Sequence, residues 1–171
     1  GMASCLFVAL RAKHPPTANH SLRVALACSS WAAAMKIPDT ERDEIEVASL
    51  LHDIGKIGVA ESVLSKSGML TDQERISAQA HAEIGAELLT SVGVLRPAID
   101  SVRSHHEKWD GTGYPDGLKG KEIPLLARII AVVDSFDAMT VDRPYRQAMS
   151  LEKARSFILE DAGTSYDPEV V

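Results

Sequence analysis

Hydrophobic residues recur at every third or fourth position along most of this chain, which is the spacing that gives a helix one buried face. The pattern predicts helices over about residues 18–36, 40–54, 71–88, 97–106, 124–139 and 151–161, with a short turn at 61–65. Only 5% of the residues are aromatic, while Ala, Leu, Ile and Glu recur at helical spacing, which favours packed helices over a sandwich of sheets. We therefore expect an all-α bundle of about six to seven helices.

Local capping signals support some of these boundaries. Thr71 and Glu74 have the spacing of a capping box, in which two side chains satisfy the free backbone amides at a helix start. Gly55 is interpreted as the stop signal of the second helix, because glycine readily adopts the backbone conformation that ends helices. This boundary places His52 and Asp53 at the end of a helix, where both side chains can face a cleft.

A different composition interrupts the helices between residues 107 and 122. The segment reads KWDGTGYPDGLKGKE and is rich in glycine, which permits positive φ and close approach of the backbone. A flexible linker would not normally contain Trp109 and Tyr114, which can serve as packing anchors. We therefore predict a structured loop.

Composition limits the classes of protein to consider. With 171 residues and 45% hydrophobic content, the chain can bury the core of one domain. A net charge of -6 argues against a surface that coats DNA or RNA, while it permits a small basic pocket for a phosphorylated ligand. Cys5 and Cys28 are the only cysteines and form no CxxC motif, which indicates a reducing, cytoplasmic setting. The apolar runs are far shorter than the roughly 20 residues of a membrane span, and we find no export signal.

The two ends of the chain indicate a piece excised from a longer protein. Gly1-Met2 looks like the remnant of a cleaved tag, and residues 3–13 are apolar at helical spacing. We expect residues 1–16 to comprise this remnant and the end of a connecting helix, followed by a single domain over residues 17–171. A connecting helix would make a homodimer reasonable, and upstream sensor or receiver segments would then supply the controlling signal.

Five of the six histidines lie in or at the ends of predicted helices: His20, His52, His81, His105 and His106. A lone histidine near an apolar face is more often a hydrogen-bonded core residue than a ligand, so only a combination with carboxylates indicates a metal. His52 and Asp53 project about 100° apart on a helix, which suits two adjacent ions bridged by the aspartate better than one chelated ion. A mixed set of histidine and aspartate favours divalent transition metals over calcium or an all-sulfur zinc site.

Three motifs follow one another along the chain. They are HDIGK at residues 52–56, HHEKWDGTGYPDG at residues 105–117, and DSFDAMT at residues 134–140, which runs into DRPYR at residues 142–146. With these motifs the sequence resembles the HD-GYP family, a branch of the HD-domain metal-dependent phosphohydrolases, over about residues 17–171. A His-Asp pair alone is a common dipeptide, whereas the long segment with the histidine pair and GYP is highly specific. The resemblance implies an HD-domain helical bundle with a Gly-rich GYP loop at Gly113, Tyr114 and Pro115.

The resemblance also implies a centre with two divalent metal ions. One ion would be held by His20, His52, Asp53 and Asp134, and the second by Asp53, His81, His105 and His106, which makes Asp53 the bridge. Iron or manganese is expected first, and nickel or zinc also accept these ligands. Two such ions lower the pKa of a bridging water, so that hydroxide is available near neutral pH. Family members with a third ion have a glutamate four residues before the first histidine, where this chain has Pro16, so we predict a dinuclear site.

The activity that the resemblance implies is hydrolysis of cyclic di-GMP, whose 3′,5′-phosphodiester link is opened to linear pGpG and in some members cut again to GMP. Asp53 and Lys56 would be catalytic, with Lys56 donating to a non-bridging phosphate oxygen as charge builds up. Arg143 and Arg146 match positions that contact phosphate or guanine in the family, since a guanidinium fork suits either. Asp137 is a candidate guanine partner, with the positioning of a metal ligand as an equal alternative. The GYP loop would shape the rim of the cleft and dock diguanylate cyclases of the GGDEF type.

Two other kinds of function stay open from the sequence. One is a different HD-domain reaction, either hydrolysis of another nucleotide or oxygen-dependent cleavage at a di-iron centre, and the GYP loop and the two arginines argue against both. The other is a catalytically weak module that binds a cyclic dinucleotide or a protein partner without turnover. Because all seven predicted ligand positions hold usable residues, catalytic competence is favoured over a degenerate site.

Overall fold

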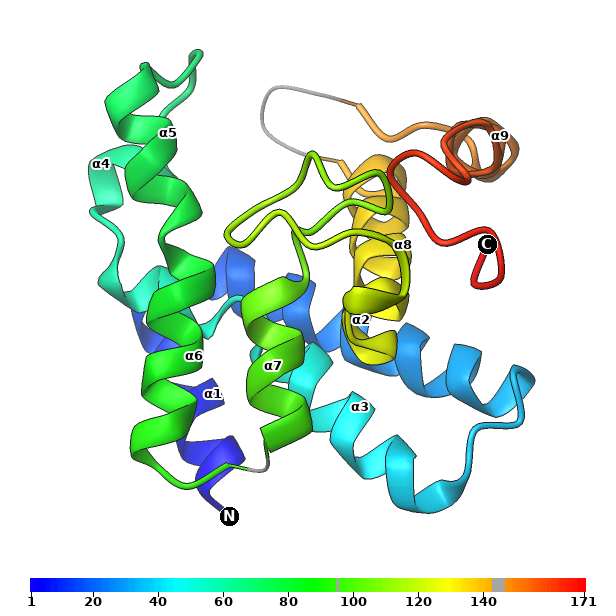
Figure 1. Cartoon of the computed structure of the whole chain (residues 1–171). Helices are drawn as coiled ribbons and strands as arrows, with labels where there is room; N and C mark the ends of the chain where they lie inside the picture. Colours follow the sequence, from blue (N-terminus) through cyan, green and yellow to red (C-terminus); the bar gives the residue numbers. More distant parts are fainter. Residues whose placement is uncertain (95, 143–146) are drawn as a thin grey trace.

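The fold is built from helices (Figure 1), and the computed structural model describes residues 1–94, 96–142 and 147–171. These residues contain nine α-helices and two short 3₁₀ segments: α1 (Met2–Lys13), α2 (Pro15–Ala34), α3 (Asp39–Leu51), η1 (Ile54–Gly58), α4 (Glu61–Leu64), α5 (Asp72–Gln79), α6 (His81–Ser91), α7 (Arg96–Ser104), η2 (Gly120–Glu122), α8 (Leu125–Thr140) and α9 (Leu151–Glu160). No β-strand occurs in the described ranges, and the all-α prediction is confirmed. None of the helices in these ranges combines the length and apolar character needed to cross a bilayer.

The helices outnumber the six to seven that were predicted, for local reasons. The N-terminal helix α1 and the one-turn helix α4 add to the set. The capping box of Thr71 and Glu74 is present, but the helix that it starts ends early and is followed after Ala80 by a separate helix, α6. At this junction the Nδ1–H group of His81 donates to the carbonyl of Ala78 at 2.6 Å, a local bond that competes with regular helical hydrogen bonding.

Two clusters of buried apolar side chains hold the helices together. The first joins α2, α3, α8 and α9 and includes Val24, Cys28, Ile45, Ile129, Ile130 and Ile158. The second joins α1, α2, α3, η1, α6 and α7 through Leu10, Ala18, Leu51, Ile54, Leu89 and Val102. Because Leu10 is fully buried in the second cluster, α1 packs against the domain, and its role as a connecting helix stays a prediction. Helix α3 contributes to both clusters, which fixes the position of the segment that follows it.

The interpretation of Gly55 as a helix stop was wrong. Helix α3 ends at Leu51, and Gly55 lies within η1 without a positive φ. A Cβ atom at this position would lie 1.9 Å from the carbonyl oxygen of His81 and 2.5 Å from the backbone nitrogen of Gly85. Glycine is therefore required because η1 and α6 approach each other closely. His52 and Asp53 still lie at the end of a helix, as predicted.

The Gly-rich loop is structured, as predicted, and lies over the ends of α7 and α8 (Figure 1). Its backbone pairs with the segment after α9: the amide of Trp109 donates to Ser165 O at 3.2 Å, and the amide of Asp110 donates to Thr164 O at 2.9 Å. The guanidinium of Arg128 lies 5.9 Å from the centre of the Trp109 ring, within the range of a cation–π contact. Trp109 therefore anchors the loop on α8.

Candidate metal centre

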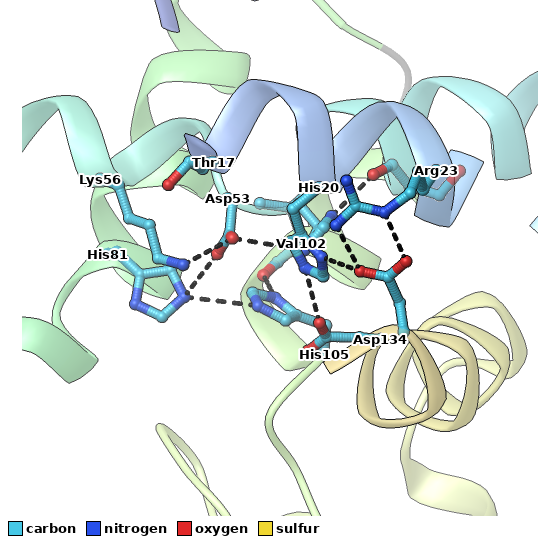
Figure 2. Close-up of polar contacts among 12 residues, drawn as sticks. Thr17, His20, Arg23, Asp53, Lys56, His81, Val102, His105 and Asp134 are labelled. Atoms are coloured by element: carbon cyan, nitrogen blue, oxygen red, sulfur yellow. Dashed lines mark hydrogen bonds and ion pairs between the residues drawn. The ribbon is translucent and has the colours of Figure 1, made fainter. Parts of the chain in front are cut away.

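All seven predicted metal ligands meet in one place, although they come from widely separated parts of the chain. His20 lies on α2, His52 and Asp53 between α3 and η1, His81 at the start of α6, His105 and His106 directly after α7, and Asp134 on α8. Figure 2 shows the side chains of His20, Asp53, His81, His105 and Asp134 pointing toward one another. The sequence motifs therefore correspond to one cluster in space.

The ligand atoms form two groups, and within each group they lie no more than 4.8 Å apart. One group is Asp53, His81, His105 and His106, and the other is His20, His52 and Asp134. Asp53 lies at the border between them, because its Oδ1 is 3.4 Å from His81 Nε2 and its Oδ2 is 3.5 Å from His52 Nε2. This is the position that a carboxylate bridging two ions would occupy.

Hydrogen bonds orient four of the imidazole rings toward the centre. The Nδ1–H groups of His52, His81 and His105 donate to the backbone carbonyls of Ser49, Ala78 and Val102 at 2.7, 2.6 and 2.7 Å. The Nδ1–H group of His20 donates to the carboxylate of Asp137 at 2.6 Å. Because His52, His81 and His105 donate through Nδ1, each can present the lone pair of Nε2, which is the arrangement of many metal-bound histidines. His20 Nε2 lies 2.8 Å from Asp134 Oδ1, so in the metal-free protein this ring pairs with two carboxylates.

The chemistry of these donors fits a bound cation. His52 Nε2 is buried and has no hydrogen-bond partner among the described residues, a condition that costs about 1–3 kcal/mol. The Nε2 atoms of His81 and His105 lie 3.4 Å apart, so two lone pairs point into the same space. One divalent ion in each donor group would satisfy these nitrogen atoms, the first at His52 and the second at His81 and His105.

Both carboxylates of the centre are held ionised. Burial opposes ionisation of Asp134, but a hydrogen bond from His20 and the charge of His52 outweigh it and lower its pKa to about 2. Burial likewise opposes ionisation of Asp53, and the neighbouring charges of Lys56 and His52 nevertheless hold its pKa well below its usual value. The centre therefore presents two negative charges at neutral pH.

Most of the imidazoles are held neutral. Burial lowers the pKa of His105 well below its ordinary value, and burial together with the charge of His81 lowers that of His106 to about 4. Burial also lowers the pKa of His81. Burial acts in the same direction on His20, but its hydrogen bonds to Asp134 and Asp137, together with the charges of Asp134 and Asp53, outweigh burial and raise the pKa of this ring. Anionic carboxylates beside neutral imidazoles form the donor set that divalent transition metals prefer.

Arg23, which sequence reasoning missed, completes a chain of contacts behind His20. Its Nε and Nη2 donate to Oδ1 and Oδ2 of Asp137 at 2.7 and 2.9 Å, and Oδ2 also accepts from His20 Nδ1 at 2.6 Å. Burial opposes ionisation of Asp137, but the hydrogen bonds and charges of Arg23 and His20 together outweigh it and lower the pKa. Because both carboxylate oxygens are engaged, the contacts favour positioning of His20 over a guanine contact. The available signal was the three-residue spacing of His20 and Arg23 on one helix.

The GYP loop reaches the metal centre itself. The ring of Tyr114 stacks on His106, with 4.9 Å between ring centroids and 24° between planes. Burial raises the pKa of the Tyr114 phenol, and the charges of Asp53 and Asp134 act in the same direction. Sequence reasoning also missed Glu107, which is buried next to this stack, and the available signal was an acidic residue directly after the histidine pair.

Lys56 lies beside the shared carboxylate. Its Nζ is 2.6 Å from Asp53 Oδ2, and Figure 2 shows the ammonium pointing into the space between Asp53 and His81. Arg143 and Arg146 fall outside the described residues, so their predicted contacts with phosphate or guanine stay predictions.

The site and the fold together define a class of protein, an all-helical domain that gathers histidines and aspartates into two adjacent groups of metal donors. Residues 5–170 match the family model described as the HD domain. The chain therefore belongs to the HD-domain family, and the family predicted from the motifs is confirmed.

Two curated relatives are similar over most of this chain. The chain is 44% identical over 158 residues to 3′3′-cGAMP-specific phosphodiesterase 3 of Vibrio cholerae, a match that covers 92% of this chain and 34% of the relative. It is 41% identical over 157 residues to a cyclic di-GMP phosphodiesterase of Thermotoga maritima, which covers 91% of this chain and 43% of the relative. The chain thus spans less than half the length of either relative.

A solved structure has the same fold. The HDG"Y"P protein Bd1817 from Bdellovibrio bacteriovorus is similar with a TM-score of 0.73 and 18% sequence identity, over 90% of this chain and 49% of that chain. At this level of identity the likeness concerns the fold alone.

Proposed function

We propose that this domain is a metal-dependent phosphodiesterase that opens a 3′,5′-phosphodiester bond of cyclic di-GMP to give linear pGpG, with a slower second cut to GMP. The observation that carries the proposal is the pair of adjacent donor groups that meet at Asp53, with Lys56 beside the shared carboxylate. The names of both curated relatives, which are cyclic-dinucleotide phosphodiesterases, support it.

The proposed cofactors are two divalent transition metal ions, with iron or manganese ahead of nickel or zinc. His20, His52 and Asp134 would hold one ion, His81, His105 and His106 the other, and Asp53 both. When bound, such ions lower the pKa of water and offset negative charge on phosphoryl oxygens. Pro16 lies in the first turn of α2 and has no side-chain donor, so the proposal is for two ions rather than three.

The residues of the chain have distinct parts in this proposal. Asp53 holds the two groups of donors against each other, and the Nδ1 hydrogen bonds keep four imidazoles from turning away when substrate enters. The side chain of Lys56 is 28% exposed, and its ammonium would turn from Asp53 to a non-bridging phosphate oxygen. Its charge would then stabilise the transition state, where negative charge on that oxygen is greatest.

Two cyclic dinucleotides, 3′3′-cGAMP and cyclic di-GMP, are candidate substrates of the proposed reaction. Relatives named for 3′3′-cGAMP and for cyclic di-GMP match this chain to a similar degree. We keep cyclic di-GMP as the proposed substrate because the motifs imply it, with Arg143 and Arg146 as the proposed phosphate or guanine contacts. Docking of GGDEF-type cyclases at the GYP loop, a homodimer and a cytoplasmic location are further parts of this proposal.

The proposal is tested by anaerobic incubation of the protein, loaded separately with Fe(II) or Mn(II), with cyclic di-GMP and in parallel with 3′3′-cGAMP. Products are followed by chromatography, and the Asp53→Asn and His52→Ala variants serve as controls. We expect linear pGpG from the intact, metal-loaded protein and none from either variant. Turnover of 3′3′-cGAMP alone would make 3′3′-cGAMP the substrate. Tight binding of nucleotide without turnover would instead indicate a domain that binds cyclic dinucleotides without hydrolysing them.

A further inference from the structure

His106 differs from the other histidines of the metal centre in how its ring is held. His20, His52, His81 and His105 each donate through Nδ1 to a protein acceptor. The His106 side chain makes no hydrogen bond within the described part of the chain, and its ring instead stacks on Tyr114 at 4.9 Å. The amide of Tyr114 also donates to the His106 carbonyl at 3.3 Å. The other ring contacts of His106 are with His81 and His105 of the same donor group, so the ring support that comes from outside that group, among the described residues, is the GYP loop.

Glu107 fastens that loop. Its side chain lies in the interior, since the residue is only 3% exposed. Its Oε1 accepts from the amides of Asp116 and Gly117 at 2.7 and 3.1 Å, and its Oε2 accepts from the amide of Leu118 at 3.0 Å. A buried carboxylate with three backbone donors holds its segment firmly, because releasing it would leave a charge without hydrogen bonds in the interior.

The loop also lies directly against the backbone that carries the histidine pair. A Cβ atom on Gly113 would lie 2.3 Å from the backbone nitrogen of Lys108 and 2.5 Å from the Cα of Glu107. Residues 113–118 thus fold back onto residues 106–108, and the Tyr114 ring stacks on the His106 ring. Arg103 fixes the far end of the segment, because its Nε and Nη2 each donate to Asp116 at 2.8 Å.

We propose that Glu107 and Tyr114 are positioning residues for the metal ligand His106: the Glu107 carboxylate sets the path of residues 113–118, and the Tyr114 ring holds the imidazole in the group formed by Asp53, His81 and His105. This inference rests on the proposed function in one respect, that this group binds a divalent ion. It gives the GYP motif a part in building the centre. It also assigns the loop's stability to Glu107, a side chain outside the Gly113-Tyr114-Pro115 tripeptide.

The stack is tested in the metal-free protein by the NMR signal of the His106 ring. Tyr114→Ala removes the neighbouring ring current, so we expect the His106 Hε1 resonance to move and broaden, whereas Tyr114→Phe retains the stack and leaves it nearly unchanged. Glu107→Gln places an amide NH₂ among three N–H donors, so the amides of residues 116–118 are expected to exchange about tenfold faster or more. Glu122→Gln is the matched control, because Glu122 accepts from Lys119 on the exposed side of the same loop.

A titration with Mn(II) supplies the second readout. Tyr114→Ala and Glu107→Gln are expected to lower the affinity for one of the two Mn(II) ions by about 10–100-fold and to leave the affinity for the other unchanged. Tyr114→Phe and Glu122→Gln are expected to bind both ions about as tightly as the wild type. Unchanged His106 signals and Mn(II) affinities in Tyr114→Ala would overturn the inference, and so would equal weakening by Tyr114→Phe. If Glu107→Gln does not fold, the comparison of Tyr114→Ala with Tyr114→Phe tests the inference. A wild-type protein that binds metal without hydrolysing cyclic dinucleotides would contradict the proposed function only, since neither readout involves turnover.

Discussion

The ammonium of Lys56 lies 2.6 Å from Oδ2 of Asp53, the same carboxylate oxygen that lies 3.5 Å from His52 Nε2. A lysine therefore sits at the border of the two donor groups, where a metal ion would compete with it for Asp53. In the proposed reaction Asp53 would hold the metal, and Lys56 would turn to the phosphate.

Replacing Lys56 by Met should separate binding from catalysis. The variant removes a charge that competes for Asp53, so metal affinity should not fall, while loss of a donor to the transition state should lower kcat by about 10²–10³-fold. Mn(II) titration and steady-state kinetics on cyclic di-GMP measure the two effects. Lys121→Met is the matched control, because Lys121 pairs with Glu169 on the surface with 69% of its side chain exposed. Equal loss of metal affinity and turnover in Lys56→Met would show that the lysine acts on folding or metal binding instead.

Replacing Asp137 by Asn should weaken the binding of the ion that His20 would hold. The amide has one acceptor oxygen in place of two, so it cannot accept all three hydrogen bonds from Arg23 and His20, and the imidazole is held less firmly. We expect about 10–100-fold weaker binding of one ion in a metal titration, with the other unaffected. Asp100→Asn, which alters an exposed pair with Arg96, should bind both ions as wild type does. A variant that keeps both metal affinities and shows only a raised KM for substrate would support the guanine contact of Asp137 instead.

The sequence was a good guide to the residues that gather at the candidate metal centre, because the three motifs carry five of the seven within short segments and helical periodicity placed the segments. The contacts that orient these ligands were harder to foresee. Arg23 and Asp137 are separated by 114 positions, and no local pattern pairs them. Such contacts are set by how α2 and α8 pack, which periodicity does not specify.

Two features of the fold differ from the sequence-based prediction. The periodicity after Thr71 continues through His81, yet the helix is interrupted at Ala80. The interruption arises because the His81 side chain bonds to the carbonyl of Ala78 in the preceding turn. Gly55 follows a helix and so resembles a stop signal, whereas its role is to let η1 approach α6. A local side-chain bond decides the first feature and a tertiary contact decides the second, and helical periodicity specifies neither.

The metal-free protein should lose stability as the pH falls from 7 to 5. Burial lowers the pKa of His106 from 6.5 to about 4 and lowers those of His81 and His105 too, so the unfolded chain binds protons on these rings before the folded chain does. Stability is then full above about pH 6.5 and decreases as the pH falls toward 4, by about 2 kcal/mol at pH 5 for His106 alone. The raised pKa of His20 acts in the opposite sense and offsets part of the loss.

Urea unfolding at pH 7, 6 and 5 measures this effect, with and without Mn(II). Bound metal competes with protons for the same imidazoles, so the loss should move to lower pH when the ion is present. Equal stability of the metal-free protein at pH 7 and pH 5 would contradict the neutral, buried state assigned to these rings.

Gly55→Ala should damage both the fold and the metal centre. The added methyl would lie 1.9 Å from His81 O and 2.5 Å from Gly85 N, and because both are backbone atoms, η1 and α6 must move apart. We expect a loss of about 3 kcal/mol or more in the free energy of unfolding. The same movement would separate Asp53 from His81, whose Oδ1 and Nε2 lie 3.4 Å apart, so the folded fraction should bind Mn(II) more weakly. Gly68→Ala, where a Cβ meets nothing within 4 Å, should change stability by no more than about 0.5 kcal/mol. Similar urea midpoints for the two variants would refute the close approach of η1 and α6.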